Sequence, residues 1–211
     1  GWAWDPETGR YGNLATGRYV SEATVREAGD MFVTQSIETN IDRITGRFLE
    51  GKIDLQTWQS QMAREIKDAH IVQACLGRGG RLQMTQADWG RLGARRREQY
   101  RYLNRFANEI NAGLLSDAEI RRRALMYARS ARTSYFDGQT SAKAAAGFTE
   151  EMRVLTPAEH CDGCITNAGF WAPIGSLPPL GSQQCLTNCR CYKRFRKHVT
   201  DQNGNTSEVI D

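Results

Sequence analysis

The chain is poor in the residues from which common enzyme sites are built. Its three histidines, His70, His160 and His198, lie far apart in the sequence. The glycine-rich stretch at residues 77–80 lacks the Lys-Ser or Lys-Thr pair that completes a phosphate-binding loop. We therefore expect no enzyme activity, and we interpret His70 as a core or surface residue of a helix.

Long apolar runs are also missing. No stretch approaches the ~20 residues that a membrane-spanning helix needs, and the mean hydropathy is -0.58. At 211 residues, the chain can bury one good core and a small second unit. These features favour a soluble protein or a subunit of an assembly, and they predict no membrane partner.

Lysine is scarce, since it supplies only 5 of the 28 basic residues. Arginine instead concentrates between residues 91 and 132, where 11 arginines stand against four acids. A guanidinium forms two parallel hydrogen bonds with a phosphate or a carboxylate, so this region is a candidate for binding nucleic acid or an acidic partner. The candidate residues are Arg95, Arg97, Arg101, Arg105, Arg121 and Arg122.

Three of these arginines, Arg97, Arg101 and Arg105, recur at four-residue steps. On a helix this spacing places them in one row, which we call the basic ridge. A ridge of this kind can follow the phosphates of a nucleic acid. The alternative is a solvated helix face, in which Glu98 pairs with a neighbouring arginine.

Residues 1–20 lack the apolar periodicity of a helix. The sequence Thr-Gly-Arg-Tyr occurs twice, at residues 8–11 and 16–19, and the glycines favour turns. We predict an extended arm with two turns. Its aromatic residues are candidates for docking onto a neighbouring subunit, and folding back onto the chain's own helices is the alternative. These residues are Trp2, Trp4, Tyr11 and Tyr19.

Apolar residues at three- to five-residue steps predict an α-helical bundle over residues 21–147. A first helix follows Ser21. A second helix carries an apolar stripe from Leu55 to Ala69 and ends at the glycines of residues 77–80.

Two further helices are expected in the same region. The third starts at Thr85 and places apolar residues as far as Leu114 in the core. The fourth starts at the capping box of Ser116 and Glu119 and runs through Tyr135. Residues 140–147, which are small and rich in alanine, are expected to form a short helix or a hinge.

Residues 148–211 hold five of the six cysteines and four of the five prolines. The cysteines form two short-spaced groups separated by a loop of 20 residues. Each group can be held on one turn and the loop lets the turns meet, which predicts a structural zinc site. Four of the five cysteines are expected to bind, with His160 in reserve. The candidate ligands are Cys161, Cys164, Cys185, Cys189 and Cys191.

Disulfides are the alternative, because Cys75 would bring the number of cysteines to an even six. Against this reading, Cys75 falls in an apolar helical stretch, and the arginine-rich chain shows no signal peptide. The expected fold is therefore mainly α. A helical bundle is followed by a small, loop-rich α+β module that zinc holds together, and an extended arm precedes both.

Four separated elements of the cysteine-rich region resemble the C-terminal signature of bacteriophage head morphogenesis proteins, the Mu-like minor head protein family. The elements are Cys-Asp-Gly-Cys at 161–164, Gly-Phe-Trp at 169–171, Pro-Pro-Leu-Gly at 178–181 and Asn-Cys-Arg-Cys at 188–191. The upstream arginine-rich helical region is also similar to that family. Where the family usually has a histidine shortly before the last element, this chain has Leu186, and Cys185 beside it is the substitute.

The resemblance implies a minor capsid component of a tailed phage or prophage, acting in head morphogenesis and DNA packaging without catalysis. It implies a place in the virion head near the portal vertex, and in the host cytoplasm during assembly. The implied partners are the portal protein, the major capsid protein and packaged DNA, in a multimeric assembly. Two other functions stay open: a zinc-stapled nucleic-acid-binding protein, and the non-catalytic part of a larger phage-encoded enzyme.

Overall fold

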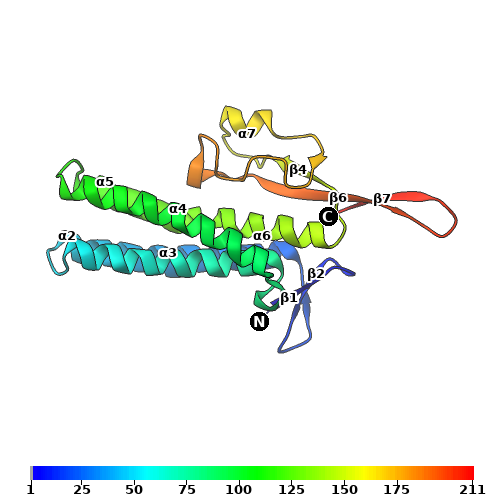
Figure 1. Cartoon of the computed structure of the whole chain (residues 1–211), viewed down its shortest axis with the longest axis horizontal. Coiled ribbons are helices and arrows are strands. Elements are labelled where there is room, and N and C mark those ends of the chain that lie inside the picture. The colour runs from blue at the N-terminus through cyan, green and yellow to red at the C-terminus, as the bar shows by residue number, and fades with distance from the viewer. Residues whose placement is uncertain (1) are drawn as a thin grey trace.

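The computed structural model describes residues 2–211, and Gly1, the first residue of the expected arm, lies outside that range. The described chain forms an elongated layer of helices with a small β-sheet on each side (Figure 1). In this view the N-terminal sheet lies below the helices and the cysteine-rich part lies above them. The expected class, a mainly α protein with a small mixed unit, is confirmed at this level.

The helical layer is built from the amphipathic segments that the sequence predicts. Its helices are α1 (Glu22–Phe32), α2 (Thr39–Leu49), α3 (Leu55–Arg78), α4 (Gln86–Asn111), α5 (Asp117–Ser130) and α6 (Arg132–Ala145). A π-helical turn, η1 (Val33–Glu38), joins α1 to α2, so the first predicted helix runs without a break. Trp58 and Phe106 lie fully buried in the main core, with ring centroids 5.5 Å apart. Within residues 2–211, no helix is long and apolar enough to cross a membrane.

Side-chain caps fix where two of these helices begin. Thr85 and Asp88 form a capping box at the start of α4, and Ser116 and Glu119 form another at the start of α5. Each box satisfies N–H groups that the first helical turn leaves unpaired. Both predicted starts are confirmed. The inward placement expected for Leu114 is wrong, because α4 ends before it and leaves it 70% exposed.

The predicted fourth helix is bent at Ala131. The hydroxyl of Ser130 donates to the carbonyl oxygen of Tyr127 at 2.7 Å. In a regular helix the Ala131 amide would donate to that carbonyl, but here it donates to the carbonyls of Ala128 and Arg129. A hydroxyl that competes for a helix carbonyl interrupts the backbone pattern and bends the helix. The expectation of one helix through Tyr135 is therefore wrong. Helix α6 starts after the bend and includes most of the stretch 140–147.

Helices α3 and α6 cross with their backbones in contact. A Cβ atom at Gly77 would overlap the carbonyl oxygen of Tyr135. A Cβ atom at Gly138 would lie 2.6 Å from the carbonyl oxygen of Ala74 and 2.8 Å from the amide nitrogen of Arg78. Real Cβ atoms do not approach a backbone so closely, so the crossing requires glycine on both helices.

The N-terminal segment is a small antiparallel sheet and not an extended arm. Its strands are β1 (Trp2–Asp5), β2 (Arg10–Asn13) and β3 (Tyr19–Val20), joined by the two expected turns. Trp4 and Tyr11 are buried, and the Tyr11 hydroxyl donates to the Leu76 carbonyl at 2.8 Å. For these two residues the structure shows the alternative, folding back onto the chain's own helices. Trp2 is half-buried, and Tyr19 is 54% exposed.

One buried lysine joins the sheet to the rest of the chain. Lys143 on α6 is 1% exposed and forms ion pairs with Glu22 of α1 and with Asp211. Its ammonium group also lies 4.4 Å from the centre of the Trp4 ring, which favours a cation at that position. Two acids and an aromatic ring from three different parts of the chain thus meet at this one charge.

The C-terminal part is loop-rich with short strands, as predicted. It contains β4 (Glu150–Val154), α7 (Asp162–Thr166), β5 (Ala172–Pro173), the 3-10 turn η3 (Leu186–Asn188), β6 (Tyr192–Thr200) and β7 (Thr206–Ile210). The strands form one antiparallel sheet in the order β5-β4-β6-β7. Strands β6 and β7 form a hairpin whose turn contains Asn203 and Gly204, and Figure 1 shows it projecting beyond the helical layer.

The crossing of α3 and α6 predicts a strong effect of one methyl group. We expect Gly138→Ala to lower the free energy of unfolding by about 1–3 kcal/mol, because an overpacked contact must move two backbones apart. The measurement is urea unfolding followed by circular dichroism. Gly93→Ala on α4 is the matched control, since a Cβ atom there meets no atom within 4 Å. It should stabilise the protein by roughly 0.5–1 kcal/mol. Equal stability of both variants would contradict the contact.

His70 is a fully buried core residue, one of the two placements that the sequence left open. Its ring nitrogens lie 2.7 Å from Oγ of Ser134 and 3.2 Å from Oγ of Ser130. Burial, with the positive charges of Arg95 and Arg96, lowers the pKa of His70 from 6.5 to about 3. The folded protein therefore keeps this ring neutral at pH values where the unfolded chain protonates it.

This difference predicts how stability depends on pH. The contribution of His70 is complete above pH 6.5 and is lost as the pH falls toward 3, because the unfolded state then binds a proton that the folded state does not. The loss is about 1.4 kcal/mol for each pH unit. His70→Gln keeps hydrogen-bonding atoms but does not titrate, so its free energy of unfolding should fall less steeply with pH. Parallel pH profiles of the two proteins, measured by urea unfolding, would refute this assignment.

Candidate metal centre

The five C-terminal cysteines lie on three short segments. Cys161 caps the N-terminus of α7, and Cys164 lies in its first turn. Cys185 and Cys189 flank η3, and Cys191 directly precedes β6. The first group therefore lies on one turn, as predicted, whereas the second group extends from η3 to the start of β6.

These turns bring the five sulfur atoms into one cluster. Sγ of Cys164 lies 3.6 Å from Sγ of Cys185 and 3.8 Å from Sγ of Cys189. Two sets of three thiols, each with its atoms within 4.8 Å of one another, can hold a metal ion. The sets are Cys161, Cys164 and Cys185, and Cys164, Cys189 and Cys191. The cluster is compatible with metal binding. All six cysteines are free, so the disulfides of the alternative reading are not formed in this structure.

Burial raises the pKa of some thiols of the cluster, whereas hydrogen bonds outweigh burial and lower the pKa of Cys161 and Cys189. Cys164, Cys189 and Cys191 are buried, and burial with the neighbouring charge of Cys189 raises the pKa of Cys191 to about 12. At Cys161 burial acts in the same direction, but hydrogen bonds from the amides of Cys164 and Cys185 outweigh it and lower the pKa to about 7. Several adjacent thiolates need a compensating cation, which a bound metal ion supplies.

Arg153 is the residue of this site that the sequence reasoning missed. It lies on β4, is fully buried, and donates from Nη1 to Sγ of Cys164 at 3.3 Å and from Nη2 to the carbonyl of Pro178. Among residues 2–211, it forms no ion pair with a carboxylate. A buried guanidinium is costly without an anion, and the sulfur of Cys164 is the group beside it that can carry the charge.

The strand that carries Arg153 has its charged residues on the buried side. Glu151 and Arg153 are both 0% exposed, and Glu151 pairs with Lys193 of β6 at 2.7 Å. Glu151 is therefore a buried acid held by an ion pair. Its neighbour Glu150 pairs with Arg196 at 2.7 Å. A strand whose alternate positions are charged is one sequence signal that could have suggested a polar interior here.

His160 stands beside the cluster in an orientation suited to a ligand. Its Nε2 lies 2.8 Å from the carbonyl oxygen of Thr156, which can only accept a hydrogen bond, so Nε2 carries the proton. Nδ1 is then unprotonated and lies 3.6 Å from Sγ of Cys191. A hydrogen bond that fixes the outer nitrogen is the usual support of a metal-bound histidine.

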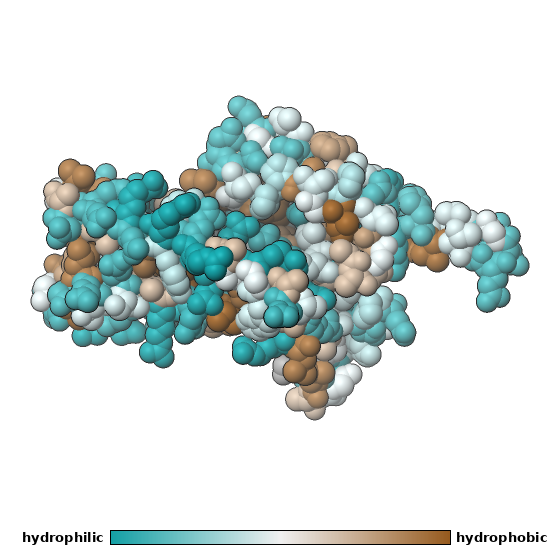
Figure 2. Space-filling model, in the orientation of Figure 1, coloured by the Kyte–Doolittle hydropathy of each residue, from teal (hydrophilic) through white to brown (hydrophobic). Residues whose placement is uncertain are grey.

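The six candidate arginines divide into two groups. Arg95 pairs with Asp137 of α6 at 2.8 Å, and Arg121 pairs with Asp42 of α2 at 3.0 Å, so these two hold helices together. The other four are exposed: Arg97, Arg101, Arg105 and Arg122. The helical layer seen in Figure 2 is covered largely by hydrophilic residues.

The basic ridge has only loose internal pairing. Arg101 lies 3.9 Å from Glu98, and Arg105 lies 4.0 Å from Glu109, both at the limit of an ion pair. Both guanidinium groups lie over the ring of Tyr102, at 5.5 and 5.6 Å from its centre. Exposed pairs of this kind contribute little to stability, so the ridge is available to a partner.

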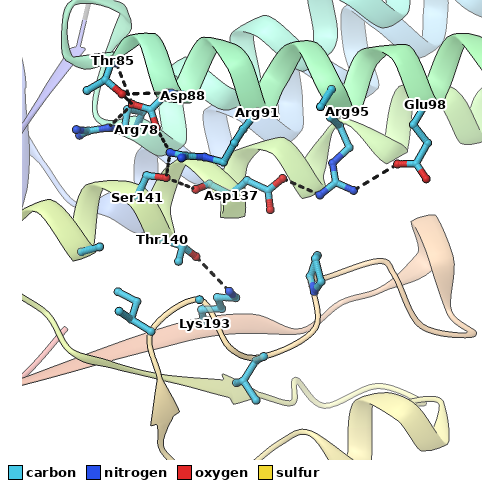
Figure 3. Close-up of a pocket in the computed structure, with 16 residues that line it drawn as sticks. Arg78, Thr85, Asp88, Arg91, Arg95, Glu98, Asp137, Thr140, Ser141 and Lys193 are labelled. Carbon is cyan, nitrogen blue, oxygen red and sulfur yellow. Dashed lines mark hydrogen bonds and ion pairs between the residues drawn. The ribbon is translucent and has the colours of Figure 1, made fainter.

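A cleft of about 700 Å³ lies between helices α4 and α6 and the C-terminal module (Figure 3). Its charged side chains pair with one another: Arg78 forms an ion pair with Asp88 at 3.0 Å, and Arg95 forms one with Asp137 at 2.8 Å. Lys193 reaches across from β6 and donates to Thr140 of α6 at 3.1 Å. Because each of its cations is paired with a carboxylate, Lys193 with Glu151 among them, we interpret the cleft as the polar seam that holds the module against the helices.

Comparisons of the chain with protein-family models, with curated proteins and with solved structures find no match. The cysteine cluster and the exposed arginines are therefore the features from which a function is inferred.

The contact between Arg153 and Cys164 predicts that the guanidinium supports metal binding. We expect Arg153→Met to weaken metal affinity about 10–100-fold, because residues that support a metal ligand have effects of this size. The measurement is competition for zinc against a coloured chelator. Arg194→Met on β6 is the matched control, since this arginine is exposed and should bind zinc as the unaltered chain does. Equal affinities of the two variants would show that Arg153 does not compensate the thiolates.

Proposed function

We propose that the cysteine cluster binds zinc and that the bound metal holds residues 148–211 together. Thiolates favour zinc, and sites without an open position are structural. The observation that carries this proposal is the buried positive charge of Arg153. No carboxylate pairs with this charge among the described residues, and a thiolate of the cluster supplies the matching negative charge. Cys161, Cys164, Cys185, Cys189 and Cys191 supply the ligands, with His160 beside them.

We further propose that the protein is a structural minor head protein of a tailed phage or prophage, located near the portal. The support is the way in which the signature elements of the sequence meet around one residue. Arg153 donates to Cys164 of the first element and to Pro178 of the third, and its carbonyl accepts from the Gly169 amide of the second. The last element is tied to the helices, because Arg132 of α6 donates to the carbonyl of Cys189.

In this proposal the signature describes a folding unit. Its spaced cysteines, glycines and prolines build a module that the metal stabilises, and the module packs on α6. The helical part then presents the basic ridge to packaged DNA or to an acidic surface of the portal or major capsid protein.

The direct test is co-expression with the portal and major capsid proteins of the phage or prophage that encodes the chain. We expect the chain to be retained on portal rings in purified particles, where electron microscopy locates it. A zinc-stapled nucleic-acid-binding protein is the second candidate, and the exposed arginines favour it. That protein would bind duplex DNA by itself with a steep salt dependence, and portal rings would not retain it.

The basic ridge gives a sharper prediction. Changing Arg97, Arg101 and Arg105 to glutamate should leave the melting temperature nearly unchanged, because exposed charges contribute about 0.5 kcal/mol or less each. Incorporation into particles or their filling with DNA should fail, since three reversed charges oppose a whole anionic surface. Particle assembly and DNA content are the measurements.

The matched control reverses three exposed arginines elsewhere, Arg18, Arg43 and Arg47, and so makes the same change in net charge. It should assemble normally. DNA-filled particles that contain the ridge variant would show that the basic ridge is an ordinary solvated helix face.

A further inference from the structure

The cysteine cluster offers more ligands than one metal ion can use. A structural zinc ion takes four ligands, whereas five sulfur atoms form this cluster and Nδ1 of His160 lies 3.6 Å from one of them, Sγ of Cys191. A mononuclear site would leave two donors idle. One of these would be a thiol packed against thiolates inside the protein.

The observed spacings fit metal-bound ligands. Four sulfur atoms at about 2.3 Å from a tetrahedral ion lie about 3.8 Å from one another. The Cys164–Cys185 and Cys164–Cys189 sulfur distances are 3.6 and 3.8 Å. A nitrogen and a sulfur on such an ion lie about 3.6 Å apart, and Nδ1 of His160 is 3.6 Å from Sγ of Cys191.

We propose that the cluster binds two metal ions that share two thiolates. Six donors complete two tetrahedral sites when two of them bridge, because eight bonds are then formed. Cys164 belongs to both of the three-thiol sets, which makes it one bridge. We assign Cys189, a member of the second set only, as the other bridge, because its sulfur lies 3.8 Å from that of Cys164 and an ion bound at the first position would draw it toward Cys161 and Cys185.

The two sets of ligands follow from this sharing. The first metal position is formed by Cys161, Cys164, Cys185 and Cys189. The second position is formed by Cys164, Cys189, Cys191 and His160. His160 thus changes from a neighbour of the site to a ligand of the second ion, and the Thr156 carbonyl, which holds the proton on Nε2, keeps Nδ1 free to bind.

The charges of two zinc ions and five thiolates are balanced by a residue of the site. Five thiolates carry five negative charges, two zinc ions carry four positive charges, and the neutral imidazole adds none. The remaining negative charge is matched by Arg153, which is fully buried and donates to the bridging sulfur of Cys164 at 3.3 Å. One ion with four thiolates would leave a net negative charge beside this single guanidinium, in a buried site where uncompensated charge is costly.

This inference rests on the proposed metal binding, and the metal content per chain tests the two separately. The full chain is loaded with zinc under reducing conditions, passed over a gel-filtration column, and analysed for zinc and protein. We expect two zinc ions per chain. One zinc ion per chain would overturn the binuclear site and leave the proposed zinc module standing, whereas a folded chain without zinc would overturn both.

His160 provides the sharper variant because it belongs to the second position alone. His160→Ala should lower the zinc content from two to one per chain, and His198→Ala, which changes an exposed histidine on β6, should keep two. If His160→Ala also retains two zinc ions, the histidine is not a ligand and the assignment of the second position fails.

Cadmium substitution supplies a readout that does not depend on folding yield. The ¹¹³Cd spectrum of the loaded chain should show two resonances of equal area that are coupled to each other through the bridging sulfur atoms. A single resonance, or two without coupling, would overturn the shared thiolates. In His160→Ala the resonance of the first position should remain, since its four ligands are unchanged.

Discussion

Helices α3 and α6 touch backbone to backbone, and the placement of the other parts of the chain depends on this contact. Gly77 and Gly138 permit it, because any side chain at either position would meet a main-chain atom of the opposite helix. The close crossing leaves the two ends of α6 free for other partners. Tyr135 and Phe136 near its start pack against the buried cysteines, while Lys143 near its end contacts the Trp4 ring of the N-terminal sheet. One helix thus joins all three parts of the chain.

The C-terminal module contrasts with the helical layer in what fills its interior. The layer buries aliphatic and aromatic side chains around Trp58. The module buries thiols, the ion pair of Glu151 with Lys193, and the guanidinium of Arg153. The module also buries a few apolar side chains, Leu180 and Phe195 among them, but a unit this small gains further stability from a covalent or metal crosslink. In the proposed function, loss of the metal would therefore also destabilise the fold of this module.

The helical region separates arginines that serve the fold from arginines that face solvent. Arg95 and Arg121 bind carboxylates of neighbouring helices and act as internal ties. Arg97, Arg101 and Arg105 occupy the solvent side of α4 and have only distant acids beside them. The same residue type thus fulfils two tasks within one short segment, and the helix face on which each arginine lies decides which.

The sequence by itself determined what depends on local spacing. Helix starts at Thr85 and Ser116, the stripe around Trp58 and the turns that carry the cysteines follow from residues a few positions apart. Contacts between distant segments were decided only by the tertiary structure. Trp4 and Tyr11 are buried because the N-terminal strands return to the end of α3, and Arg153 joins the cysteine cluster because β4 passes beside Cys164. The local sequence does not identify the partner in either pairing: the alternating charges of β4 suggest a polar interior, but nothing along the chain pairs Arg153 with Cys164 or Tyr11 with Leu76.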